Sequence, residues 1–178
     1  PSRPSGIEPA AASPLASGQE HRFKRGTATH KLMQILPDLP PARRQSAAEQ
    51  FLARPALGLP PTMQKDIARE VMAILNDETF KDIFGEGSMA EIPVTGLIDQ
   101  QTLITEQTDP ILIRENDILI VDYKTNRPPP VRKEDVSPVY IRQMKAYADA
   151  LRKIYPKKKV RAALLWTDGA RLMEITAV

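Results

Sequence analysis

The segment from residue 117 to residue 126, DILIVDYKTN, constrains the fold of this chain more than any other stretch. Its aliphatic run, Ile118 to Val121, predicts a strand that is covered on both faces. Because side chains alternate along a strand, Asp122 and Lys124 share one face, while Tyr123 points to the other. This arrangement suits a site where Asp122 holds a divalent cation and Lys124 meets an anionic oxygen or a nucleophilic water. An ordinary salt-bridged strand end would produce the same short pattern.

A second strand is predicted upstream, at residues 91–100, EIPVTGLIDQ. Asp99 comes at the end of its apolar stretch, as Asp122 does in the later strand. Gly96, inside the strand, indicates a bulge or a close backbone approach. Two carboxylates brought together by paired strands form a ligand set that suits Mg²⁺. Taken alone, Asp99 is better explained as a turn residue.

A third element is the amphipathic helix predicted at residues 138–154. Apolar residues recur there at spacings of three and four, which defines the face that packs against the core. Gln143 and Tyr147 are four residues apart and lie together at the edge of that face. They are either half-buried boundary residues or a functional pair, which contacts a nucleic-acid backbone or orients Lys124.

Three patterns occur in a fixed order along the chain: Gly96-x-x-Asp99, then Asp122-Tyr-Lys124, then Gln143-x-x-x-Tyr147. Together they resemble the PD-(D/E)XK nucleases, in the branch related to the RecB nuclease domain. That branch carries a histidine on an upstream helix, and His30 fits this role. A lone histidine beside an apolar helix face is otherwise more often a packed boundary residue than a metal ligand.

The resemblance extends beyond these patterns, over about residues 24 to 176, where the chain looks like the C-terminal nuclease domain of AddA-type helicase–nucleases. The segments that carry it begin at Gly26, Phe84, Ala90, Asp122 and Ala163, and include DYKTNRPPP and ALLWTDG. Gln100 departs from the pattern, because relatives usually have a basic residue after the aspartate. That difference affects a phosphate contact and not the metal site.

The resemblance implies an Mg²⁺-dependent deoxyribonuclease, with Mn²⁺ able to substitute. His30, Asp99, Asp122 and the backbone carbonyl of Tyr123 would hold the metal, and Lys124 would orient the attacking water. Gln143 and Tyr147 would fix the DNA strand or Lys124, with Glu91 and Thr125 as minor candidates. The implied partners are single-stranded DNA, the helicase portion of the parent chain and an AddB-type subunit. An inactive DNA-binding module of the same complex and a stand-alone exonuclease of the same superfamily are the alternatives.

Length and composition predict one domain and exclude some cofactors. The chain has 178 residues and no Cys, which excludes disulfides and a Cys-bound iron–sulfur cluster. No apolar run is long enough to span a membrane. Residues 1–22 predict a flexible tail that precedes a nuclease domain at residues 23–178. Because the chain begins without Met and has no signal-peptide pattern, it is expected to be a fragment of a longer cytoplasmic bacterial protein.

The coarse element order predicts an α/β fold, with a mixed central sheet flanked by helices and a helical N-terminal portion. Proline residues and apolar spacing place helices at about 24–36, 41–54, 61–76, 78–84 and 138–154. Strands are expected at about 89–98, 101–106, 111–114, 117–124, 160–167 and 170–175. The last two are joined at Thr167-Asp-Gly169, which is typical of a hairpin.

Basic residues are concentrated in the C-terminal half. Residues 124–161 contain twelve Lys and Arg against three Asp and Glu, although the net charge of the whole chain is only +3. The positive charge of this span would attract a polyanion, and the binding of that polyanion would be sensitive to salt. A solvated helix face explains part of the same pattern equally well. Trp166, the only Trp, lies in an apolar strand and is expected in the core.

Overall fold

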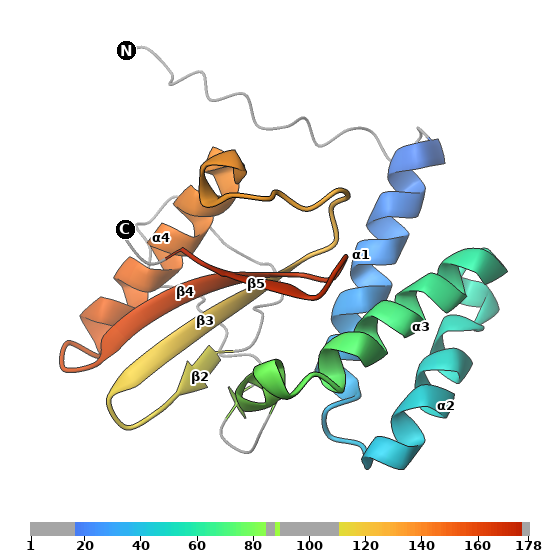
Figure 1. Ribbon diagram of the computed structural model, residues 1–178, viewed down its shortest axis with the longest axis horizontal. Helices are drawn as coiled ribbons and strands as arrows, with labels where there is room; N and C mark the ends of the chain where they lie inside the picture. Colours follow the sequence, from blue (N-terminus) through green and yellow to red (C-terminus); the bar gives the residue numbers. More distant parts are fainter. Residues whose placement is uncertain (1–16, 85–87, 90–110, 176–178) are drawn as a thin grey trace.

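The computed structural model describes residues 17–84, 88–89 and 111–175 (Figure 1). The helices are α1 (Ser17–Ile35), α2 (Pro41–Leu52), α3 (Pro61–Leu75) and α4 (Pro138–Ile154), with short 3-10 segments η1 (Pro55–Leu57), η2 (Glu78–Ile83) and η3 (Lys133–Asp135). The strands are β1 (Ser88–Met89), β2 (Ile111–Ile113), β3 (Asp117–Lys124), β4 (Lys159–Trp166) and β5 (Arg171–Glu174). None of the helices in the described ranges has both the length and the apolar character needed to cross a bilayer.

The five strands form one mixed sheet in the order β1-β2-β3-β4-β5. β3 and β4 are parallel over their whole length, from Asp117 opposite Lys159 to Lys124 opposite Trp166. The other neighbours pair antiparallel. Parallel strands require a crossover connection, and α4 supplies it between β3 and β4. The expected α/β fold with a mixed sheet is therefore confirmed.

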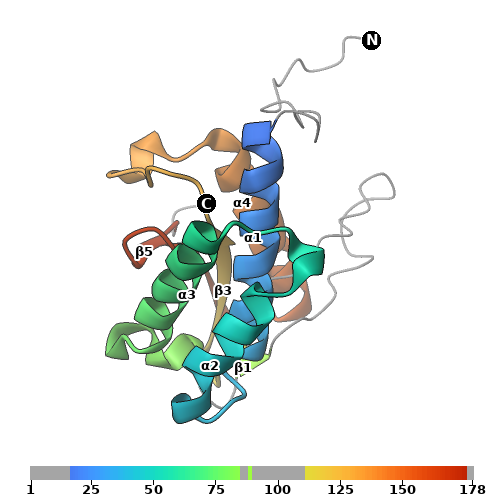
Figure 2. The same ribbon diagram turned by 90° about the vertical axis from the view of Figure 1, so that its right-hand side faces the viewer.

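The two faces of the sheet are covered by different helices, which gives the molecule two cores (Figure 1). α4 packs on one face, where its Met144 and Leu151 join Ile118 and Ile120 of β3 in one cluster. The helices α1, α2 and α3 cover the other face, in front of the sheet in Figure 2. β3 is therefore buried on both sides, as its unbroken aliphatic run predicts.

The helix α1 begins earlier than the sequence predicts. It starts at Ser17, so residues 17–22, assigned above to a flexible tail, are helical, and this part of the prediction is wrong. The added turns bury no large apolar residue, and apolar spacing therefore gives no sign of them. Within them Glu20 pairs with Lys24 one turn later, with 2.6 Å between carboxylate and ammonium. That hydrogen bond and charge lower the pKa of Glu20.

Most other boundaries agree with the periodicity of the sequence. α4 matches its predicted range of 138–154 to the residue, while residues 78–83 form a 3-10 helix rather than an α-helix. The hairpin between β4 and β5 is confirmed, and Gly169 takes a left-handed φ of 81° in its turn. Beyond residue 89, the expected strand at 89–98 lies outside the described residues, as does the one at 101–106.

Candidate active site

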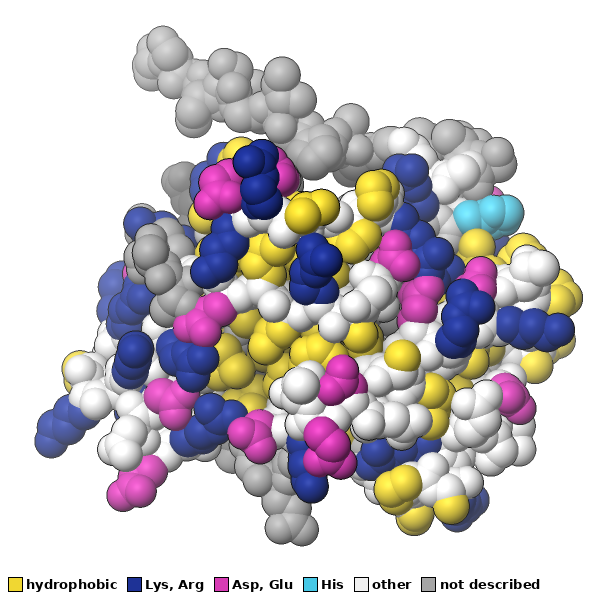
Figure 3. Space-filling view, viewed as in Figure 1, with side chains coloured by type: hydrophobic (Ala, Val, Ile, Leu, Met, Phe, Trp, Pro, Cys, Tyr) yellow, Lys and Arg dark blue, Asp and Glu magenta, His cyan; other side chains and the backbone are white. Residues whose placement is uncertain are grey.

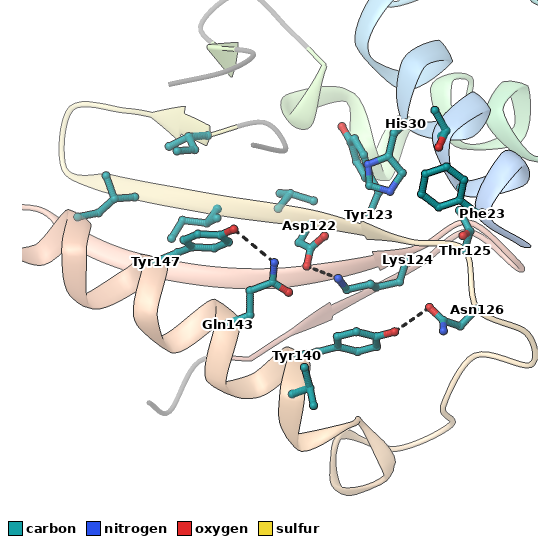
Figure 4. Close-up of a pocket in the computed structure, with 17 residues that line it drawn as sticks. Phe23, His30, Asp122, Tyr123, Lys124, Thr125, Asn126, Tyr140, Gln143 and Tyr147 are labelled. Atoms are coloured by element: carbon teal, nitrogen blue, oxygen red, sulfur yellow. Dashed lines mark hydrogen bonds and ion pairs between the residues drawn. The ribbon is translucent and has the colours of Figure 1, made fainter. Parts of the chain in front are cut away.

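A cavity of about 520 Å³ opens where the carboxyl end of β3 meets α1 and α4 (Figure 4). It gathers residues from three elements that are far apart in the sequence. The site residues among those that line it are His30, Asp122, Tyr123, Lys124, Thr125, Gln143 and Tyr147. Asp99 and Glu91 lie outside the described residues, so their positions relative to this pocket stay predictions.

Asp122 and Lys124 form a buried ion pair on the α4 side of β3. Their Oδ2 and Nζ atoms are 2.6 Å apart, and only 8% and 13% of the two side chains are exposed. Desolvating two charges costs free energy that their attraction does not reliably return, so such a pair is weak evidence for a stabilising role. The strand that carries them is braced, because the Thr167 N–H donates to the Lys124 carbonyl at 3.0 Å. The pair is therefore held rigidly at the strand end.

Tyr140, at the start of α4, is a site residue that the sequence patterns did not identify. The Lys124 ammonium lies 4.1 Å from the centroid of its ring, a cation–π contact. Its hydroxyl donates to Asn126 Oδ1 at 3.0 Å, and its ring packs 6.2 Å from that of Trp166. The spacing could have revealed it, since Tyr140 lies one helical turn before Gln143 on the same face.

Gln143 and Tyr147 meet on α4 as their spacing predicts. The Gln143 amide donates to the Tyr147 hydroxyl at 3.3 Å. Tyr147 is 8% exposed and belongs to the apolar cluster beneath α4, whereas Gln143 is half-buried beside the cavity. The pair thus reaches the pocket from the side opposite α1, and Figure 4 shows both side chains pointing toward β3.

His30 approaches the same pocket from α1. Its ring packs edge-on against Tyr123, with 5.7 Å between centroids, and Phe84 stacks on Tyr123 at 6.5 Å. Phe23, Gly26, Thr27 and His30 recur at helical spacing, and all four line the cavity. Tyr123 belongs to the core cluster under α1–α3 and therefore links His30 to that core.

A buried ion cluster joins α1 to α3 and to the segment after β3. Glu70 of α3, 8% exposed, accepts from Arg25 Nη2 at 2.7 Å and also pairs with Arg127. Burial lowers the pKa of the Arg25 guanidinium, while nearby Asp66 and Asp168 act in the opposite direction. Because Arg127 follows Lys124 closely, this cluster anchors the chain that leaves the candidate site.

The donor set suits a divalent cation that prefers oxygen and imidazole ligands. The described residues contribute the buried Asp122 carboxylate, the His30 imidazole and the Tyr123 carbonyl, with no thiolate in the chain. Within the described ranges no group of three or more His, Cys, Asp or Glu side chains gathers. Completion of the site would therefore rest on Asp99, which the sequence predicts as the second carboxylate.

Several cations of the basic span are paired with acids. Arg127 pairs with Glu70, Arg152 with Asp149, and Arg161 with Glu174. The Glu174 carboxylate holds the pKa of Arg161 above its usual value. Basic and acidic side chains are accordingly interspersed on the face in Figure 3. For Arg152 and Arg161, the structure favours the reading of a solvated, salt-bridged surface, whereas Arg127 belongs to the buried cluster around Glu70.

Comparison with known proteins identifies one family. A family model described as the PD-(D/E)XK nuclease superfamily matches residues 6–174. The matched range contains all the elements that form the pocket, from α1 through β3 to α4. No curated protein matches the chain.

Proposed function

Because the chain belongs to the PD-(D/E)XK nuclease superfamily, we propose that it is an Mg²⁺-dependent deoxyribonuclease domain that hydrolyses phosphodiester bonds in single-stranded DNA. One observation carries this proposal: Asp122, Lys124, Gln143 and Tyr147 line the same cavity, with His30 facing them from α1. The cavity thus combines a buried acid, an amine and an imidazole.

Asp122 and His30, with the carbonyl of Tyr123 and the predicted Asp99, would hold the metal. A bound divalent ion supplies positive charge against the phosphate and lowers the pKa of a coordinated water. The positive charge of Lys124 meets the negative charge that develops on the phosphate during attack. Its Nζ, held between Asp122 and the ring of Tyr140, is directed toward the cavity. A compact ammonium suits this task, since it donates to several oxygens at once.

Gln143 and Tyr147 contribute polar groups from the opposite wall. In the present arrangement the Gln143 amide donates to the Tyr147 hydroxyl. The remaining amide hydrogen of Gln143 and the hydroxyl of Tyr147 are suited to donate to DNA phosphate oxygens. Such contacts position the strand and carry no sequence information. The two side chains therefore orient the DNA relative to Lys124.

The proposed cellular setting is a double-strand-break repair complex of the bacterial cytoplasm. There the domain would be the nuclease part of an AddA-type helicase–nuclease that works beside an AddB-type subunit. The support is the sequence resemblance in the segments that begin at Gly26, Phe84, Asp122 and Ala163. A helicase delivers unwound strands, so a domain in this position would receive single-stranded DNA at high effective concentration.

The test compares cleavage of single-stranded and blunt duplex oligonucleotides with Mg²⁺, Mn²⁺ or EDTA at two salt concentrations. Wild-type protein should cut single strands faster, and only with metal. Asp122→Asn should abolish cutting, whereas the matched control Asp117→Asn, at the other end of β3, should retain it. Metal-independent cutting, or equal cutting by Asp122→Asn, would refute the site. Preference for duplex would favour a stand-alone exonuclease, and DNA binding without any cleavage would favour an inactive module.

A further inference from the structure

Phe23 is an exposed aromatic residue at the mouth of the candidate site. Its side chain is 76% exposed, although it lines the same cavity as Asp122 and Lys124. The other large hydrophobic residues exposed in the described chain are aliphatic: Val131, Ile154 and Leu172. A single exposed apolar side chain is ordinary in a soluble protein, so exposure alone has no functional meaning. The position of Phe23 beside the candidate catalytic groups is what distinguishes it.

Between Phe23 and His30, the face of α1 that lines the cavity carries only small side chains. The residues between them on this face are Gly26 and Thr27, which project little from the helix. His30 follows Phe23 by seven positions in α1, which corresponds to a rise of about 10 Å along the helix axis. Figure 4 shows both rings on the α1 side of the pocket. Phe23 therefore lies at the same α1 wall of the cavity as His30, about two helical turns away.

The cavity offers a nucleic acid strand two complementary features. Lys124 presents a positive charge inside the cavity, which suits a phosphate. Phe23 presents the face of an aromatic ring to solvent, and nucleobases stack on such rings whatever their identity. Bases in an intact duplex are already paired and stacked on their neighbours, and breaking these contacts costs free energy. Only an unpaired base can therefore stack on Phe23 without that cost.

We propose that Phe23 is a stacking platform for an unpaired base next to the scissile phosphate, and that it gives the site its selectivity for single strands. This inference rests on the proposed nuclease function and specifies the feature of the substrate that the site recognises, an unpaired base. The contact is tolerant of sequence, because it uses the π-face of a base and none of its edges. A bound single strand would run from Lys124 to Phe23 across the wall of the cavity that Gly26, Thr27 and Thr125 line.

The first experiment measures binding of a fluorescent single-stranded oligonucleotide, with Ca²⁺ in place of Mg²⁺ so that the DNA stays intact. Phe23→Leu should weaken binding about 10-fold, which is within the range of a lost base–aromatic stack, and Phe23→Trp should restore it. The matched control Leu172→Ala removes an exposed apolar side chain from β5 and should bind as wild type does. Binding by Phe23→Leu equal to that of wild type would overturn the proposal.

The second experiment moves a single abasic site along the oligonucleotide. Wild-type protein should lose affinity at one position, and Phe23→Leu should be insensitive there, because the same contact is already missing. An identical abasic profile in both proteins would overturn the assignment of Phe23 and favour a protein-docking role. Cleavage of the intact oligonucleotide by wild type with Mg²⁺ is measured in parallel. Absence of that cleavage would reject the proposed function, while the binding series would still decide the role of Phe23.

Discussion

The two faces of β3 carry different kinds of residue at the C-terminal end of the strand. On the side of α1–α3, the side chains of the strand stay apolar up to its C-terminal end. They are Leu119, Val121 and Tyr123, and all three belong to one core cluster. On the side of α4, Ile118 and Ile120 begin in the same way, but the row continues with Asp122 and Lys124. Both faces are buried, so burial does not explain the difference.

The contrast shows where the molecule accepts a cost in stability. The α1–α3 face gains hydrophobic free energy at Leu119, Val121 and Tyr123. The α4 face instead buries a carboxylate and an ammonium, whose mutual attraction offsets their desolvation only in part. Functional sites commonly break the packing rule in this way, while the rest of the fold compensates. One face is therefore shaped by folding and the other by the requirements of the site.

The largest expected effect comes from removing the charges of the α4 face. The double variant Asp122→Asn, Lys124→Met should lower kcat for single-stranded DNA on the order of 10³-fold or more. Since both charges disappear together, the free energy of unfolding should be unchanged or higher. Single-turnover cleavage and urea denaturation measure the two quantities. A large loss of stability would show that the ion pair supports the fold, and the contrast between the faces would fail.

The next largest effect is expected on stability, from a substitution on the apolar face of β3. Leu119 is 6% exposed and packs in the cluster under α1–α3. Leu119→Ala should lower the free energy of unfolding by about 3 kcal/mol, through lost burial and the cavity left behind. Below the unfolding transition, kcat per folded molecule should stay within about 2-fold of wild type. Leu172→Ala, on an exposed position of β5, is the control and should cost less than about 1 kcal/mol.

The sequence predicts most of this fold because its local signals agree with the tertiary structure. The proline at the first position of each of α2, α3 and α4 marks a helix start, and the aliphatic runs of β3 and β4 mark the parallel pair. The start of α1 was missed, since its first turns are stabilised by surface contacts such as Glu20 with Lys24. Apolar periodicity does not report contacts of this kind.

The candidate site was predictable where chemistry and spacing coincide, as at Asp122-x-Lys124 and Gln143-x-x-x-Tyr147. Tyr140 and Phe23 were missed because their roles depend on contacts between distant elements. Tyr140 matters through the face of its ring, which Lys124 reaches from β3, and Phe23 through its exposure beside a cavity built by other segments. The spacing from Gln143 places Tyr140 on the same face of α4, but it does not show that the ring contacts Lys124. Asp99 lies outside the described residues, and its place in the site stays a prediction.

The smallest effect tests whether the ring of Tyr140 belongs to the charged face. Tyr140→Leu should lower kcat about 10-fold by removing the cation–π contact that holds Lys124, with little change in KM. Tyr140→Phe retains the ring and loses only the hydrogen bond to Asn126, so its kcat should lie within about 3-fold of wild type. Asn126→Ala should match Tyr140→Phe, and Tyr155→Leu, which removes a ring at the far end of α4, is the control. If Tyr140→Phe were as slow as Tyr140→Leu, the hydroxyl and not the ring would position Lys124, and the charged face would depend on Asn126 instead.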